Sequence, residues 1–243
     1  MSGHSHAKTI KRAKDLTDQK RGQMFSKMAR VISVAVKEGG PNPETNSKLR
    51  VAIEEAKKFN LPKENIERAI KQVTGSGEEA NLEEVLFEAY GPGRIAIIIE
   101  GITDNKNRTL SEIKQTLNQN NGKLADTGSV KWLFERKGVI EVQSTKYEDG
   151  KKEDLELLAI EAGAQDIYWH DDFLDVYTKI EDSEKVKKNL EEKGIKIESA
   201  SLDWVAKEEI SVDEKIKGAY QKLFEALDEN EAVQDVYSNI KLP

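Results

Sequence analysis

The first 75 residues of the chain carry hydrophobic side chains at helical spacing. In the segment that starts near residue 18, these side chains are Met24, Met28, Val31, Ile32 and Ala35. The same three- and four-residue spacing returns in residues 49–56 and again in residues 66–73. The breaks "EGGPNPE" and "FNLPKEN" separate the segments, because glycine and proline end helices. The pattern therefore predicts three amphipathic helices joined by short loops.

After residue 81 the pattern alternates between strand-like and helix-like segments. "RIAIIIEGI" (94–102) is a continuous apolar run typical of a buried strand, and "TLSE" (109–112) is a capping box that opens a helix. "GSVKWLFE" (128–135) is the next strand. The order strand–helix–strand occurs again near the C-terminus. Its elements are a strand "SLDWVA", a helix after the capping box "SVDE" (211–214), and a strand "VQDVYSN".

Between those two sets lies a complete unit of six elements. Its predicted strands are "GVIEVQ", "DIYWH", "FLDVYTKI" and "IKIESA", and its predicted helices are "EDLELLAIEAG" and "SEKVKKNLEEKG". Their order is strand–helix–strand–strand–helix–strand, which defines a ferredoxin-like module. We therefore predict an α+β protein that has an N-terminal three-helix domain and two ferredoxin-like βαββαβ domains, one inserted in the other.

The domain boundaries are predicted from this order and from one linker. The apolar spacing stops at "TGSGEEAN" (74–81), which is rich in small and polar residues. We expect a basic helical domain at residues 1–77 and a discontinuous α+β domain at residues 82–136 and 202–243. Residues 137–201 are expected to form the inserted ferredoxin-like α+β domain.

The sign of the charge changes at the same linker. The chain has 243 residues and a formal net charge of -7. Residues 1–75, which we call the basic head, hold 16 Lys and Arg against 8 Asp and Glu, a net charge of +8. The remainder therefore carries -15. A basic head on an acidic body is typical of a protein whose head faces a polyanion.

Composition excludes several classes of function. The chain has no cysteine, which excludes disulfides, thiolate metal sites and a cysteine nucleophile. It has no apolar run of about 18 residues and no apolar signal core at its N-terminus. We therefore expect a cytoplasmic protein without a membrane partner. No nucleophile, base or metal-ligand set has catalytic spacing, so we expect no enzyme, no catalytic residue, no metal and no cofactor.

The most basic stretch is "SGHSHAKTIKRAKDLTDQKRG" (2–22), which we call the N-terminal arm. Its bases are spaced among apolar residues, and cations on one side of a helix can follow a row of phosphates. Serine and histidine add neutral donors. The predicted nucleic-acid contacts are His4, Ser5, His6, Lys8, Lys11, Arg12, Lys14, Lys20, Arg21, Lys27 and Arg30. A solvated surface and docking to an acidic protein are the alternatives.

Three further bases are predicted as secondary anion contacts. Arg94 ends "YGPGR" (90–94), which lacks the Gly-Lys-Ser/Thr ending of a phosphate loop and precedes a strand, so a turn is the better interpretation. Lys106 and Arg108 lie at the start of the predicted helix, and a helix N-terminus can hold an anion. Solvated bases beside a helix cap are the alternative for these two.

The three tryptophans each lie in a strand-like run. They are Trp132, Trp169 and Trp204. Packing into the core is the expected role of such residues, and stacking on a nucleic-acid base is the alternative.

Five long stretches carry a resemblance to one protein family. They are "GHSHAKTIKRAKDLTDQKRGQMFSKMARVI" (3–32), "LPKENIERAIK" (61–71), "EAYGPGRIAIIIEGITDNKNRTLSEIK" (88–114), "TGSVKWLFERKG" (127–138) and "EALDENEAVQDVYSNI" (225–240). The chain resembles the YebC/PmpR family, which includes a mitochondrial translational activator, nearly end to end. It departs at His6 and Ala7, where the family often has Lys-Trp, and at Arg94 and Ala125, where glycine is common.

The resemblance implies a cytoplasmic, non-enzymatic regulator of gene expression with three domains. Some family members are described as DNA-binding transcriptional regulators, which is the first expectation here. Others are described as ribosome-associated translation factors that relieve stalling, for example at proline runs. No helix-turn-helix with an exposed, base-reading helix stands out, which weakens specific DNA readout. The expected partner is therefore nucleic acid, either DNA or ribosomal RNA, and the ribosome under the second route.

Overall fold

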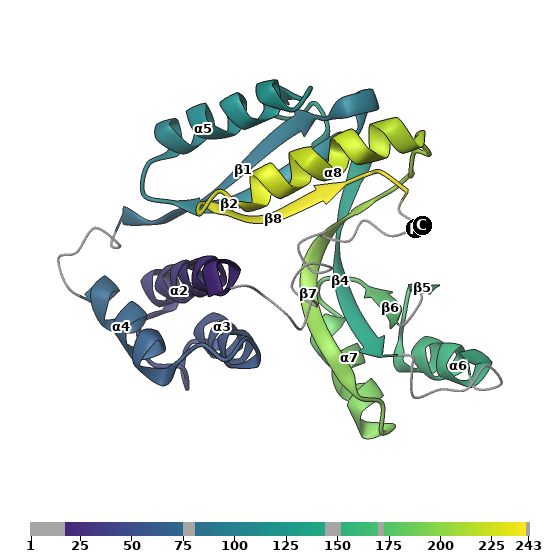
Figure 1. Cartoon of the computed structure of the whole chain (residues 1–243). Helices are drawn as coiled ribbons and strands as arrows, with labels where there is room; N and C mark the ends of the chain where they lie inside the picture. The colour runs from purple at the N-terminus through teal and green to yellow at the C-terminus, as the bar shows by residue number, and fades with distance from the viewer. Residues whose placement is uncertain (1–17, 75–80, 144–151, 170–172, 242–243) are drawn as a thin grey trace. The chain divides into compact units, whose positions relative to one another are not determined.

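The computed structural model describes residues 18–74, 81–143, 152–169 and 173–241, and it separates into two compact units (Figure 1). The first unit contains the described residues up to Val130 together with 212–236. The second unit contains the described residues of 131–211 together with 237–241. The chain therefore leaves the first unit after Val130 and returns to it at Val212.

Three helices open the first unit, as the hydrophobic spacing predicts. They are α2 (Asp18–Gly39), α3 (Ser47–Lys58) and α4 (Lys63–Thr74). One face of each helix contributes to a shared core in which Ile32 and Leu49 are fully buried. Helices of 12 residues, such as α3 and α4, are marginal alone in water, so this shared core supplies most of their stability.

The corner between α2 and α3 is closed by the buried side chain of Asn46. Its Oδ1 accepts a hydrogen bond from the backbone N–H of Leu49 at 3.0 Å, which caps the start of α3. Its Nδ2 donates to the carbonyl oxygens of Ala35 at 2.6 Å and Gly40 at 2.8 Å, near the end of α2. One amide thus satisfies backbone groups that two helix ends leave open.

The first unit also contains a four-stranded sheet in the order β3–β1–β2–β8. Its strands are β1 (Glu83–Tyr90), β2 (Ala96–Thr103), β3 (Lys123–Ala125) and β8 (Val233–Ser238). Two helices, α5 (Lys106–Gln119) and α8 (Glu214–Asp228), lie together on one face of this sheet (Figure 1). Strand β2 is buried along nearly its whole length, as its continuous apolar run predicts.

Strand β1 is the main departure from the predicted topology of this sheet. It precedes β2 in the chain and lies between β2 and β3, a position that the third strand fills in a βαββαβ sheet. The apolar pattern does not reveal β1 because three glutamates interrupt it. One of them, Glu88, is buried and accepts hydrogen bonds from the N–H groups of Gly128 at 2.6 Å and Val130 at 2.7 Å.

The second unit has the six elements of a ferredoxin-like module in the predicted order. They are β4 (Phe134–Gln143), α6 (Lys152–Ala162), β5 (Asp166–Trp169), β6 (Phe173–Thr178), α7 (Ser183–Glu192) and β7 (Ile197–Ala206). The sheet order is β5–β6–β4–β7, and every neighbouring pair is antiparallel. The predicted α+β fold class, with N-terminal helices followed by two α+β sheets, is confirmed.

Two long strands of this unit correct the predicted strand boundaries. The sequence predicts separate strands at 128–135 and 138–143, but a single strand, β4, begins at Phe134 and runs to Gln143, and residues 131–133 of the first predicted strand form a short turn of 3-10 helix. Gly138 resembles a break in the pattern, yet it lies inside β4. A Cβ at that position would come within 2.3 Å of the Thr178 hydroxyl, so the close packing requires glycine.

Strand β7 shows the same correction on the other side of the pair. "IKIESA" and "SLDWVA" form this single strand instead of two. It pairs with β4 from Phe134 opposite Ala206 to Val142 opposite Ile197, with a bulge near Glu141. Residues that the sequence assigns to the discontinuous domain therefore extend the sheet of the second unit.

We predict that residues 131–211 fold alone and that residues 137–201 do so with lower stability. The shorter fragment loses the five outer pairs of the β4–β7 ladder, from Phe134 opposite Ala206 to Gly138 opposite Leu202, and with them Val205, which packs against Val139 and Tyr177. Loss of a buried aliphatic side chain and its cavity costs about 2 kcal/mol or more. Urea unfolding followed by circular dichroism measures the difference. Equal stabilities of the two fragments would contradict this account of the strand ends.

Candidate nucleic-acid interface

Seven of the predicted contact residues lie N-terminal to the described part of the chain. They are His4, Ser5, His6, Lys8, Lys11, Arg12 and Lys14. Their contacts with nucleic acid stay predictions. The described chain begins at Asp18, at the start of α2.

Lys20 and Arg21 lie in the first turn of α2, and both are exposed. The first N–H groups of a helix carry a positive partial charge, which adds to the charge of these two side chains. The beginning of α2 therefore concentrates positive potential at the point where the N-terminal arm joins the helix. This arrangement is compatible with the predicted phosphate contacts.

Lys27 and Arg30, which also belong to the predicted set, bond to the sheet side of their own unit. Lys27 is only 4% exposed, and its Nζ donates to the carboxylate Oδ1 and to the backbone carbonyl of Asp228, both at 2.7 Å. Arg30 donates to the carbonyl oxygen of Ile102 at 3.1 Å and to the carboxylate of Glu231 at 3.2 Å. The acceptors are a helix end, a strand carbonyl and two acids, so these two charges are compensated within the molecule.

Lys37 continues this row of bases on α2. Its Nζ donates to the carbonyl oxygen of Leu82 at 3.1 Å, just before β1. Val34, in the same turn of α2, is buried against Leu82 and Ile102. Lys27, Arg30 and Lys37, which we call the sheet-facing row, thus flank the apolar contact that joins α2 to the sheet. The sequence predicts phosphate contacts for Lys27 and Arg30, and in the structure all three side chains of the row bond within the unit.

Other bases of the basic head remain at its surface. The exposed ones on α3 and α4 are Lys48, Arg50, Lys57, Lys58, Lys63, Arg68 and Lys71. Some of them have acidic neighbours: Lys48 bonds to Glu38, which raises the pKa of the Lys48 ammonium, and Lys63 lies 3.6 Å from Glu67. Positive charge on these two helices is therefore diluted by acids, whereas the sequence of the arm has six bases and two acids.

The three secondary anion contacts do not come together in one place. Arg94 precedes β2, and Lys106 follows it at the start of α5. Strand β2 has eight residues and is therefore about 26 Å long. Arg108 contacts the carboxylates of Asp104 and Glu112, which partly neutralise its charge.

The local structure at two of these bases also refines the predicted elements. "YGPGR" forms a turn, as expected, and Arg94 adopts a left-handed φ of 63°, which explains why glycine suits this position. Helix α5 begins at Lys106 rather than at Thr109, because Asn105 caps it by accepting from the N–H of Arg108 at 3.0 Å. The Thr109 hydroxyl lies inside the helix, 2.8 Å from that of Thr103.

Two family models match the chain and together span most of its length. The model described as the TACO1/YebC protein N-terminal domain matches residues 5–76. The model described as the TACO1/YebC second and third domain matches residues 82–240. The chain belongs to the TACO1/YebC family. The resemblance seen in the sequence motifs is thereby confirmed.

Relatives of this TACO1/YebC chain match it over nearly their whole length. A probable transcriptional regulatory protein of Dehalococcoides mccartyi is 43% identical over 239 residues, which cover 98% of this chain and 94% of the relative. A protein of the same description from Halothermothrix orenii is 44% identical over 244 residues, 100% of this chain and 96% of the relative. The crystal structure of a conserved hypothetical protein from Aquifex aeolicus is 43% identical, with a TM-score of 0.83 over 93% of this chain and 92% of that one.

The tryptophans of this TACO1/YebC chain have different environments. Trp169 is half-buried in the core of the second unit and donates from Nε1 to Glu156 at 2.6 Å, which confirms its packing role. Trp204 is also half-buried. Trp132, by contrast, is 64% exposed, so the expectation of core packing is wrong for this residue.

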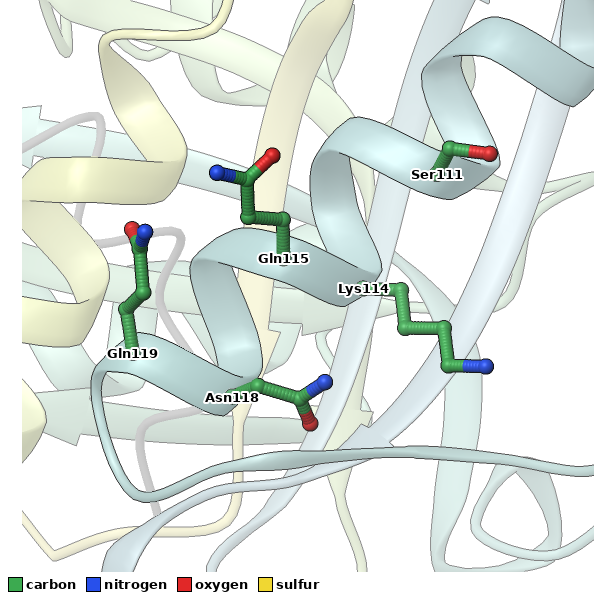
Figure 2. Close-up of a pocket in the computed structure, with 5 residues that line it drawn as sticks. All are labelled: Ser111, Lys114, Gln115, Asn118 and Gln119. Atoms are coloured by element: carbon green, nitrogen blue, oxygen red, sulfur yellow. The ribbon is translucent and has the colours of Figure 1, made fainter.

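Two shallow depressions on the surface each lie along a single helix. One is lined by Ser111, Lys114, Gln115, Asn118 and Gln119, whose side chains project from α5 (Figure 2). The other is lined by Glu64, Glu67, Arg68, Lys71 and Gln72 of α4. Neither depression brings groups from different elements together, as a substrate site would require.

The described ranges contain neither a metal site nor a membrane-spanning helix. Outside the gaps, no group of three His, Asp or Glu side chains has a geometry that could hold a metal ion. None of the helices in those ranges is long and apolar enough to cross a bilayer.

We predict that Lys27→Met lowers stability and leaves nucleic-acid affinity unchanged. The substitution removes two hydrogen bonds from a charged donor, which costs about 2–3 kcal/mol. Lys20→Met, at an exposed position, is the matched variant. It is expected to cost less stability and to lower the slope of log affinity against log salt by about 1. Urea unfolding and salt-dependent binding to duplex DNA and single-stranded RNA measure both effects. If Lys27→Met lowered the slope of log affinity against log salt, Lys27 would be a phosphate contact after all.

Proposed function

We propose that this TACO1/YebC-family protein is a non-enzymatic regulator of gene expression that binds nucleic acid through its basic head. The observation that carries the proposal is the concentration of charge in the N-terminal arm, which has six Lys and Arg but only two acids. The sheet-facing row is occupied by contacts within the first unit. Phosphate contact is therefore assigned to the arm, which includes Lys20 and Arg21 at the beginning of α2.

The charge distribution also limits where nucleic acid binds. Residues after 75 carry a net charge of -15, which repels a polyanion over most of the chain. The basic head, at +8, attracts it. Association driven by phosphate contacts releases counterions, so the affinity should fall as salt rises. We infer that the head makes the main contact with nucleic acid, because the net charge of the rest of the chain opposes long-range attraction to phosphates.

The first route for this regulator is DNA binding and transcriptional control. The relatives described as probable transcriptional regulatory proteins support this route. The arm and Lys20 and Arg21 would then position the protein on the phosphate backbone. Such contacts give affinity and register but carry no sequence information by themselves.

The second route is ribosome association, with ribosomal RNA as the polyanion and relief of stalling as the role. The composition of α4 favours this alternative. Its exposed face carries Arg68, Lys71 and Gln72, but also Glu64 and Glu67. Two carboxylates on a short helix are unfavourable next to duplex phosphates, so α4 is poorly suited to reading a major groove. Structured RNA needs no such helix.

We predict that reversing three charges in the arm, with Lys11, Arg12 and Lys14 changed to Glu, weakens nucleic-acid binding and its salt dependence. For every phosphate that the variant no longer neutralises, the slope of log affinity against log salt should fall by about 0.9 for duplex DNA and about 0.7 for a single strand. Fluorescence anisotropy over a salt series measures both quantities.

The matched control for this variant is the same reversal of Lys185, Lys187 and Lys188. These bases lie on α7 in the second unit, so the change in net charge is identical but its place is different. The control is expected to bind with nearly the wild-type slope. Equal slopes for the two triple variants would show that the arm touches no phosphate and would refute the proposal.

In-cell crosslinking followed by sequencing of the bound nucleic acid separates the two routes. Recovery of promoter DNA would support transcriptional control, and recovery of ribosomal RNA would support the translational role. The arm variant serves as the control, because material that crosslinks equally to it does not depend on the arm.

A further inference from the structure

The second unit carries an exposed indole at one end of its longest strand pair. Trp132 lies in the turn Lys131–Leu133, directly before β4, and 64% of its surface is exposed. It is the most exposed large hydrophobic residue in the described ranges. Because a tryptophan in contact with water forgoes a large gain from burial, such a residue is a candidate for ligand contact.

Positively charged side chains surround this part of the strand pair. The Lys131 Nζ lies 5.0 Å from the centre of the Trp204 ring, and the Arg136 guanidinium carbon lies 5.2 Å from it. Both distances are in the range of a cation–π interaction. Lys207 donates from Nζ to the carbonyl oxygen of Trp132 at 2.8 Å. The three cations therefore lie at the end of the strand pair that carries the Trp204 ring and the Trp132 backbone, and we call Lys131, Trp132, Arg136, Trp204 and Lys207 the Trp132 patch.

Acids also lie near the Trp132 patch in the sequence. Glu135 contacts Lys137 at 3.4 Å, and along a strand these two side chains lie on the face opposite Arg136. Glu208 and Glu209 follow Lys207 in the chain. Lys131 and Arg136 lie beside the Trp204 ring and Lys207 bonds to the Trp132 backbone, and such cations favour a polyanionic ligand over an apolar protein surface.

The backbone under the patch is held in place by the sheet. Arg136 and Trp204 are opposite each other in the β4–β7 register. The backbone N–H of Lys207 donates to the carbonyl oxygen of Leu133 at 2.9 Å, which fixes the turn to the end of the ladder. The backbone that carries these side chains therefore needs no rearrangement on binding, which favours affinity.

We propose that the Trp132 patch binds unpaired nucleotides of single-stranded RNA. Trp132 provides the face on which a base stacks, and Lys131, Arg136 and Lys207 contact the adjacent phosphates. Unpaired bases are exposed in RNA loops and bulges, whereas duplex DNA keeps its bases stacked inside the helix. This inference rests on the proposed nucleic-acid binding and adds a second contact surface, in a different unit from the basic head.

The test uses the full chain, a labelled mixed-sequence single-stranded RNA of about 12 nucleotides, and a DNA duplex as the second probe. Trp132→Ala is expected to weaken RNA binding about tenfold, because stacking on one aromatic ring contributes that much per base. Its affinity for the duplex should not change. Trp132→Phe should retain part of the RNA affinity, and the RNA should quench the tryptophan fluorescence of the wild type more than that of Trp132→Phe.

The matched control is Leu157→Ala on α6, which removes another exposed apolar side chain, 58% exposed, from the same unit. It should leave RNA binding unchanged. Lys131→Gln and Arg136→Gln should each lower the salt slope for RNA by about 0.7, whereas Trp132→Ala should leave the slope intact. Thermal unfolding of each variant verifies that it is folded.

Each outcome separates this inference from the proposed function. Three results would overturn the Trp132 patch and leave the proposed role of the basic head standing. Trp132→Ala could bind RNA with wild-type affinity, or it could lose affinity for RNA and duplex equally. The third result is a wild type that binds the duplex but not the RNA. Failure of the wild type to bind either probe would overturn both proposals. Fluorescence quenching that persists at low salt in the arm variant would support the patch as a separate site.

Discussion

The ammonium of Lys27 meets α8 at the last residue of that helix, where it bonds to both the side chain and the carbonyl of Asp228. The final carbonyls of a helix have no partner within the helix and carry a negative partial charge, so a buried cation is well placed there. Because Lys27 lies two turns into α2, this contact and the bonds of Arg30 and Lys37 determine which side of α2 faces the sheet. The opposite side is left to α3 and α4, whose core then forms around Ile32.

This constraint divides the bases of the head into two groups with different roles. The sheet-facing row bonds to carbonyls and carboxylates within the first unit, and Lys27 is buried there. Lys20 and Arg21, one to two turns earlier on the same helix, are exposed. The two groups have the same pattern in the sequence. A basic flank beside an apolar stripe is suited to packing against acids as well as to binding phosphates.

The sequence predicted most of the fold because most of its elements have one clear hydrophobic period. The three N-terminal helices and the ferredoxin-like module follow from that period. Strand β1 escaped prediction because Glu88 is buried in it, and the two N–H groups that stabilise this carboxylate come from residues 40 or more positions away. The burial of Lys27 depends in the same way on a partner 201 positions away. Contacts at such separations leave no local pattern in the sequence. The basic arm could therefore be recognised from the sequence, but the residues at which the candidate site ends could not.

The tryptophans show how position in the fold, rather than residue type, decides between packing and recognition. Trp169 ends the short strand β5, where α6 lies close enough for Glu156 to accept its indole N–H, so the ring becomes part of the core. Trp132 precedes the first pair of the β4–β7 ladder, where its ring is left largely in water while its carbonyl is held by Lys207. A fixed backbone, an exposed ring and nearby cations satisfy the physical requirements for stacking a base beside a phosphate. The acidic composition of the chain as a whole therefore does not restrict nucleic-acid contact to the head, because local clusters of bases can outweigh the average charge at short range.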